Sequence, residues 1–425
     1  MKLSISLQIA LLVFLFPVLI FSQSEMATND LKWMKNWTNF DPSETYYPEA
    51  DKKLPNVIDK DTYLNNSSVY LLSGNTYVTN NAKLTIEEGT IIRCDRDNPS
   101  SLIVTKGATL IARGSYTKPI VFTSNQTEKS RKPGDWGGIS IAGGGSTNTL
   151  SGMGRIEGDF NPILSGYGGN TADEITTILS YIRIEYAGKK INRSKELNGL
   201  SLYALGKNSI ISNIMVSYSA DDSYEFFGGN AELSNLISFK AKDDDFDFTE
   251  GFQGNLTNIV AIRHPYISDT SGSYAIEIDG YTEGKGVRSI SSLSKVSIDG
   301  GYLISLSEQD NYQYTVAAIS AKYRGQLTLT NSRISGFANI VAFDASYSNA
   351  TEIKNAFTLE NSVFNVHGEA IQTALGNNAT LQNLVKYNMY TNHFKEVTDF
   401  FSDPMNKHLP DFSLKDNLGN YTVMH

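Results

Sequence analysis

Three neighbouring stretches of the chain are nearly identical and follow one another at a nearly constant interval. Ile211-Ser212-Asn213-Ile214 recurs as Leu233-Ser234-Asn235-Leu236 and as Leu256-Thr257-Asn258-Ile259, so that the asparagines are 22 and 23 residues apart. A short β-like motif that returns at such a period predicts a solenoid in which each repeat forms one coil. We therefore expect an all-β fold, a parallel β-helix with about 22–23 residues per coil.

The recurring asparagine predicts a regular corner between strands. Asparagine reaches left-handed backbone angles at low cost, and coils stacked about 4.8 Å apart bring equivalent side chains into contact. Their amides then form a hydrogen-bonded ladder, as in stacked β-structures. The alternative is that each asparagine serves its own turn independently. The candidates for the ladder are Asn213, Asn235, Asn258, Asn361 and Asn383.

The pattern divides the chain into four parts. Residues 1–22 combine Lys2, an apolar run and small polar residues at its end, which is typical of a secretory signal peptide. Residues 23–67 are expected to form an N-terminal cap or leader, with a short helix at 31–37. Residues 68–390 are expected to form the β-helix, on the order of a dozen coils in a rod of about 60 Å. It is interrupted by loops at 127–175 and longer connections at 265–325. Residues 391–425 are expected to be a C-terminal cap or tail.

Charge and cysteine content exclude several classes of partner and location. Without residues 1–22 the chain carries 35 basic and 45 acidic side chains, a formal charge of −10. Such a surface repels nucleic acids and anionic lipids. Cys94 is the single cysteine, so no disulfide forms within the chain and a lipid anchor on an N-terminal cysteine is not expected. No second long apolar run follows the signal segment, so no transmembrane segment is expected in the exported chain.

The strongest local signal is acidic. Residues 221–250 hold nine Asp or Glu against two Lys. The period of 22 places Asp221 under Asp243, Asp222 under Asp244 and Glu225 under Asp247. Stacked carboxylates repel one another or share protons unless a cation joins them. Hard oxygen ligands favour Ca²⁺, so we expect a Ca²⁺ site that uses some of Asp221, Asp222, Glu225, Asp243, Asp244, Asp245 and Asp247. The alternative is a solvated acidic face whose repulsion is relieved by nearby Lys and Arg.

Aromatic and basic residues near these acids suggest a ligand-binding surface. Tyr224, Phe226, Phe246 and Phe248 alternate with the acids and are expected to stack in the core, with a sugar-stacking platform as the alternative. Three side chains recur five residues after the repeated asparagines and are expected to face solvent: Tyr218, Lys240 and Arg263. In Gly134-Asp135-Trp136-Gly137-Gly138 a packing role is expected for Trp136, with ligand binding as the alternative.

Four motifs in order give the chain a family resemblance. They are Lys132-Pro133-Gly134-Asp135-Trp136-Gly137-Gly138, Ile182-Arg183-Ile184-Glu185-Tyr186-Ala187-Gly188, the run from Ser219 to Gly229, and Asp243-Asp244-Asp245-Phe246-Asp247. Over about residues 68–345 the chain resembles a family of secreted bacterial β-helix proteins without an assigned activity. The resemblance implies a right-handed parallel β-helix of the pectate-lyase-like kind. It implies no catalytic residues.

These observations leave three functional hypotheses. The first is an exported, non-catalytic β-helix that binds a glycan or another surface component, with Tyr218, Lys240, Arg263 and Trp136 as candidate contacts and Ca²⁺ as a candidate cofactor. The second is a Ca²⁺-assisted polysaccharide lyase or glycoside hydrolase, with candidate catalytic residues Asp221, Asp243, Asp244, Lys240 and Arg263. The third is a structural surface rod. The extracellular space, the outer cell surface and the periplasm all fit the signal segment.

Overall fold

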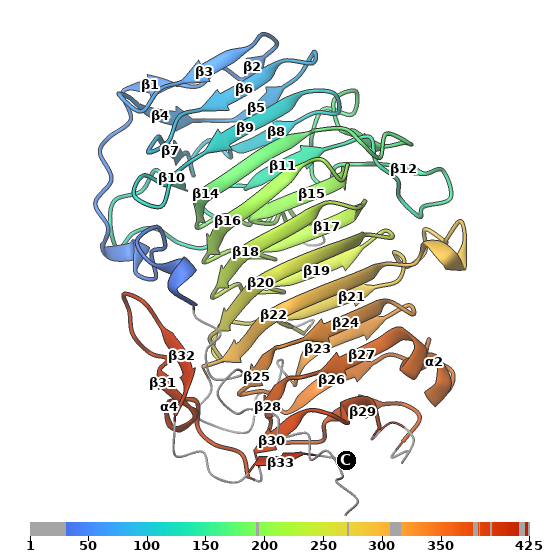
Figure 1. Cartoon of the computed structure of the whole chain (residues 1–425). Coiled ribbons are helices and arrows are strands. Elements are labelled where there is room, and N and C mark those ends of the chain that lie inside the picture. Colours follow the sequence, from blue (N-terminus) through green and yellow to red (C-terminus); the bar gives the residue numbers. More distant parts are fainter. Residues whose placement is uncertain are drawn as a thin grey trace, which may run out of the picture.

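Parallel strands stack coil upon coil along the chain and form a β-helix in the computed structural model (Figure 1). The structure describes residues 31–423 except 193–194, 270–271, 307–315, 377–380, 382, 392 and 416–420. The predicted signal segment lies outside the described residues. Among the described residues, no helix combines the length and the apolar character needed to cross a membrane.

One face of the β-helix is an 11-stranded sheet in which every pairing is parallel. Its strands are two to six residues long, as expected for coils with tight corners. They are β2 (Val57–Ile58), β5 (Asn75–Val78), β8 (Ser101–Val104), β11 (Ile139–Ala142), β15 (Leu200–Leu205), β17 (Tyr224–Gly229), β19 (Phe246–Thr249), β21 (Ile276–Asp279), β23 (Ala317–Lys322), β26 (Asn339–Phe343) and β29 (Ile371–Thr373).

The remaining coil strands form an 18-stranded sheet. Some of its long strands bend at a corner and pair with two shorter strands of the neighbouring coil. Its N-terminal half contains β1 (Lys52–Lys53), β3 (Thr62–Leu64), β4 (Val69–Leu72), β6 (Lys83–Ile86), β7 (Ile91–Cys94), β9 (Thr109–Arg113), β10 (Ile120–Ser124), β14 (Thr177–Glu185) and β16 (Ile210–Ser217). Its C-terminal half contains β18 (Glu232–Phe239), β20 (Gln253–Arg263), β22 (Lys295–Ser305), β24 (Gln326–Thr330), β25 (Arg333–Ser335), β27 (Phe357–Glu360), β28 (Val363–Asn365), β30 (Met389–Thr391) and the antiparallel β33 (Tyr421–Val423).

Short helices and hairpins lie between the coil strands and at the two ends of the chain. The prediction of loops throughout 127–175 was wrong in part, because β11 inside this range is a coil strand that pairs with β8 and β15. The rest of the range carries the hairpin of β12 (Met153–Arg155) and β13 (Gly166–Gly168). The connections predicted to lengthen at 265–325 do so, since Ile276 pairs with Ile319, 43 positions later. The other elements are η1 (Leu31–Met34), η2 (Pro42–Glu44), η3 (Ile290–Ser292), α2 (Ala350–Ala356), η4 (Asn383–Val385), α4 (Val397–Phe400), β31 (Phe401–Asp403) and β32 (Asp411–Leu414).

The predicted asparagine ladder exists over three coils. The side-chain amide of Asn258 donates to that of Asn235 at 3.0 Å, and Asn235 donates to Asn213 at 3.5 Å. All three have φ between 55° and 59°, the left-handed conformation that the corner requires. Asn361 keeps this conformation with φ of 52°. The inclusion of Asn383 was wrong, because this residue begins the 3₁₀ helix η4 instead of a corner.

The aromatic residues of the acidic repeats lie in the core, as the core interpretation predicted. Tyr224 stacks on Phe246 with ring centroids 5.0 Å apart, and Phe226 stacks on Phe248 at 4.7 Å. All four rings are fully buried. Because side chains alternate across a strand, burial of these rings turns the residues between them outward.

The N-terminal segment takes a different place from the predicted cap. Residues 52–64 already form the first coil through β1, β2 and β3. Residues 31–49, which we call the N-terminal strap, lie along the flank beside β16 and β18 (Figure 1). The strap buries Trp37 and Phe40 against Met215 and Phe239. The hairpin of β31 and β32 packs on the same flank, within the same apolar cluster.

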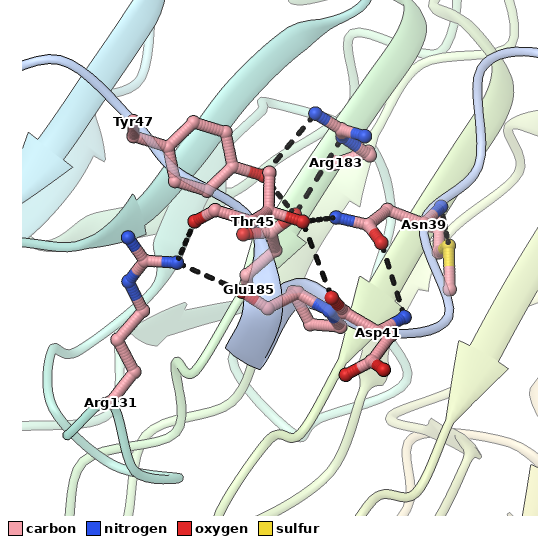
Figure 2. A network of polar contacts seen from close by, with 9 residues as sticks. Asn39, Asp41, Thr45, Tyr47, Arg131, Arg183 and Glu185 are labelled. Atoms are coloured by element: carbon pink, nitrogen blue, oxygen red, sulfur yellow. Dashed lines mark hydrogen bonds and ion pairs between the residues drawn. The ribbon is translucent and has the colours of Figure 1, made fainter. Parts of the chain in front are cut away.

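Polar contacts hold the N-terminal strap in place, as Figure 2 shows. The buried guanidinium of Arg131 donates to the carbonyl oxygens of Pro42 and Thr45, each at 2.8 Å. The Tyr47 hydroxyl donates to the Glu185 carboxylate at 2.9 Å and accepts from Arg183 at 3.3 Å. Arg131, Arg183 and Glu185 on the flank are therefore hydrogen-bonded to the strap.

Candidate functional site

The acids of two successive coils stack as the period predicted. Glu225 on β17 pairs in register with Asp247 on β19, and both point away from the stacked aromatic core. The turns before these strands bring in Asp221, Asp222 and Asp243. We call Asp221, Asp222, Glu225, Asp243 and Asp247 the acidic cluster.

The acidic cluster contains two groups of three carboxylates whose oxygens converge. In each group, one oxygen from every residue lies within 4.8 Å of the others. The first group is Asp221, Asp222 and Asp243, and the second is Asp222, Glu225 and Asp247. Asp222 belongs to both groups and is only 8% exposed. This geometry matches a set of oxygen ligands for a hard divalent cation.

Burial keeps these carboxylates from ionising easily. Burial, and next to it the neighbouring Asp221, raises the pKa of Asp222 well above its usual range. The pKa of Asp243 rises to about 7, chiefly through burial and then through repulsion from Asp269. In the part of the chain that the structure describes, no Lys or Arg forms an ion pair with a member of the acidic cluster. A bound cation would remove both the repulsion and the proton uptake.

Two of the seven predicted metal ligands have other partners. Asp245 is fully buried and forms an ion pair with Arg263 at 2.8 Å. The Asp244 carboxylate accepts from the backbone amide of Tyr274. Neither residue belongs to a converging group, so the ligand set that the structure supports is the acidic cluster alone.

The predicted solvent-facing row of Tyr218, Lys240 and Arg263 is wrong in part. Arg263 is 1% exposed and forms an ion pair with the buried Asp245, so its guanidinium does not face solvent or a ligand. The Lys240 ammonium lies over the rings of Phe239 and Tyr218, 4.8 Å and 5.6 Å from their centroids. Tyr218 packs against the apolar flank that the N-terminal strap covers. The three residues thus do not form a shared ligand surface.

Trp136 is a core residue, as the packing interpretation expected. Its ring is fully buried, and its indole nitrogen donates to the carbonyl oxygen of Glu185 at 2.8 Å. No face of the ring is left for a ligand.

A cleft of about 1150 Å³ opens beside the acidic cluster. Asp221, Asp222 and Glu225 line its acidic side. The loop at 155–165 contributes Arg155, Glu157 and the ring of Phe160. The remaining polar lining consists of Lys190, Lys195, Glu196, Lys242 and Asp269. Basic side chains therefore stand on the walls without pairing to the acidic cluster.

The acidic surface extends beyond the predicted residues. Glu277 on β21 pairs in register with Asp247, and its carboxylate forms an ion pair with Lys322 at 2.6 Å. Asp279 follows on the same strand. The sequence analysis did not identify the cleft residues at 155–165, 190–192 and 195–196 or the acids at 277–279. The intervening loops differ in length, and this hides the register of these residues. The alternation of Glu277 and Asp279 with Ile276 and Ile278 was the one available signal.

Comparison with known proteins gives one match. The family model described as "pectate-lyase like beta helix domain" matches residues 56–402. No curated protein matches significantly. No solved structure matches significantly either. The match covers most of the chain and agrees with the stacked parallel sheets.

Proposed function

Because the chain belongs to the family of pectate-lyase-like β-helix domains, we propose that it is an exported, non-catalytic β-helix that binds a glycan in the cleft beside the acidic cluster. The observation that carries this proposal is the combination of converging carboxylates, of which Asp222 is buried and the others are half-buried, with an open polar cleft. The fold alone does not decide function, since one fold hosts many activities.

The chemistry of the cleft suits a polyhydroxylated ligand. Carboxylates accept hydrogen bonds from sugar hydroxyls. The ammonium group of Lys195 would donate to hydroxyl or carboxylate oxygens of a ligand, whereas Lys190 already forms an ion pair with Glu196. Phe160 offers an apolar ring for a sugar face. A Ca²⁺ ion held by the acidic cluster would add coordination to ligand oxygens, since Ca²⁺ takes six to eight oxygen ligands and protein carboxylates rarely fill all positions.

The placement of the two candidate bases argues against the lyase arrangement that the sequence predicted. Lys240 stacks on aromatic rings of the flank, and Arg263 is buried in its ion pair with Asp245. A catalytic base must come within hydrogen-bond reach of the proton that it removes. Neither residue lines the cleft, so the lyase arrangement expected from the sequence lacks its base.

A polysaccharide panel tests the proposal. The chain of residues 23–425 is passed over immobilised glycans with Ca²⁺ or with EDTA, and the eluates are assayed for unsaturated ends and reducing sugars. We expect retention that depends on Ca²⁺, no turnover, and loss of retention in Asp222→Asn, while Asp59→Asn on an exposed turn is retained normally. Turnover by the wild-type chain would support the enzyme hypothesis, and no retention on any glycan would support a structural rod.

A further inference from the structure

The acidic cluster carries more negative charge than one divalent cation can balance. Its five carboxylates bear a charge of −5 when ionised, so a single Ca²⁺ would leave −3 within one group of half-buried and buried side chains. Residual repulsion of this size favours the binding of a second cation. Two divalent cations would leave −1.

The geometry provides two places for such ions. The two converging groups share only Asp222, and a carboxylate with two oxygens can ligate two ions at once. Asp222 is 8% exposed, and its Oδ1 is oriented by the backbone amide of Asp244 at 2.8 Å. Each group also holds one oxygen that is buried and has no hydrogen-bond partner among the described residues, Asp243 Oδ1 in the first and Asp247 Oδ1 in the second.

A residue outside the acids supports the second position independently. Asn198 is 4% exposed and its amide nitrogen donates to the Glu225 carboxylate. Its Oδ1 is buried and has no hydrogen-bond partner in the described part of the chain. An unpaired buried amide oxygen costs free energy, and such an oxygen is an ordinary ligand of Ca²⁺. The Asn198 amide lies against Glu225 with its nitrogen toward the carboxylate, so turning the amide over would bring its unpaired oxygen to this group.

We propose that the chain binds two divalent cations bridged by Asp222, one held by Asp221 and Asp243 and the other by Glu225, Asp247 and Asn198. The oxygen-only ligand set suits hard divalent cations such as Ca²⁺. This inference deepens the proposed function, because the cations lie on the acidic side of the cleft that would hold the glycan.

Calorimetric titration of Ca²⁺ into the EDTA-treated chain of residues 23–425 tests the bridge. We expect two ions per chain in the wild type and in the control Asp59→Asn. Asp221→Asn and Glu225→Gln should each bind one ion. Asp222→Asn should bind both at least tenfold more weakly. Thermal unfolding in EDTA checks that each variant is folded, which we expect because every substitution removes a repelling charge without changing side-chain size much.

The outcomes separate the bridge from the proposed function, because glycan retention is measured on the same samples. One ion in the wild type, or two ions in Glu225→Gln, contradicts the bridge; retention of the glycan in that case leaves the proposed function intact. Two ions without retention of any glycan supports the bridge and contradicts the proposed function. No binding of Ca²⁺ contradicts both the bridge and the role of a cation in glycan binding.

Discussion

The flank under the N-terminal strap and the acidic cluster both contain buried charged groups. Arg93 on the flank has an ion-pair partner, whereas the carboxylates of the acidic cluster have none among the described residues. On the flank, the buried Arg93 forms an ion pair with Glu49 and donates to two strap carbonyls. In the acidic cluster, like charges converge and the described chain supplies no ion pair. Buried charges that a fold needs for stability are normally paired. The contrast supports the proposal that the acidic cluster binds a ligand.

The largest effect is expected from breaking a paired charge. Arg263→Met should lower the free energy of unfolding by about 3–5 kcal/mol, because it leaves the fully buried Asp245 without its partner. Chemical denaturation of the variant measures this loss. The double variant with Asp245→Asn should recover part of it. A loss below about 1 kcal/mol would mean that the ion pair contributes little, and that paired and unpaired charges differ less than we infer.

Removal of an unpaired buried charge should stabilise the fold instead. In EDTA at pH 8, Asp222→Asn should raise the free energy of unfolding, because it removes a carboxylate whose charged form is disfavoured by burial and by the neighbouring Asp221, which raise its pKa. Chemical denaturation in parallel with Asp59→Asn, expected to stay within about 0.5 kcal/mol of wild type, provides the control. Destabilisation by Asp222→Asn would show that this carboxylate supports the fold.

The pH dependence follows from Asp279, which lies outside the two converging groups. Burial, and after it Glu277, raises its pKa to about 7, against the lowering effect of Lys322. An acid with a raised folded-state pKa stabilises the fold below its unfolded pKa near 4 and loses that contribution as pH rises to about 7. Without Ca²⁺ we expect stability to fall between pH 5 and 7, on the order of 1 kcal/mol per pH unit.

The variant Asp279→Asn tests this assignment. Its melting temperature, followed by circular dichroism in EDTA, should fall less steeply between pH 5 and 7 than that of the wild type. Equal slopes for the two chains would assign the pH dependence to other groups.

The smallest effect concerns the strap. Tyr47→Phe removes a hydroxyl that donates to Glu185 and accepts from Arg183, and should cost about 0.5–1.5 kcal/mol. Denaturation followed by tryptophan fluorescence measures it, since Trp37 of the strap is buried against the flank. Unchanged stability would indicate that water replaces the hydroxyl and that the strap is held by its apolar contacts.

The sequence was sufficient wherever neighbouring coils have equal length. The spacing of Asn213, Asn235 and Asn258 predicted both the coil and the ladder, and the spacing of Glu225 and Asp247 predicted their stacking. Equal spacing fixes register, and register fixes which side chains meet.

The sequence could not fix side-chain direction in turns or contacts across long distances. Asp243, Asp244 and Asp245 are adjacent in one turn, yet only Asp243 joins the acidic cluster, because backbone angles there decide each direction. The position of the strap depends on contacts such as Asn39 with Met215, which no local pattern reveals. The walls of the cleft come from loops whose lengths break the period.

The effect of Ca²⁺ on thermal unfolding tests the central contrast most directly. At pH 8, excess Ca²⁺ should raise the melting temperature of the wild-type chain above its value in EDTA, because it supplies the charges that the acidic cluster lacks. The same addition should leave Asp222→Asn nearly unchanged. Equal melting temperatures of the wild type with Ca²⁺ and with EDTA would contradict the account.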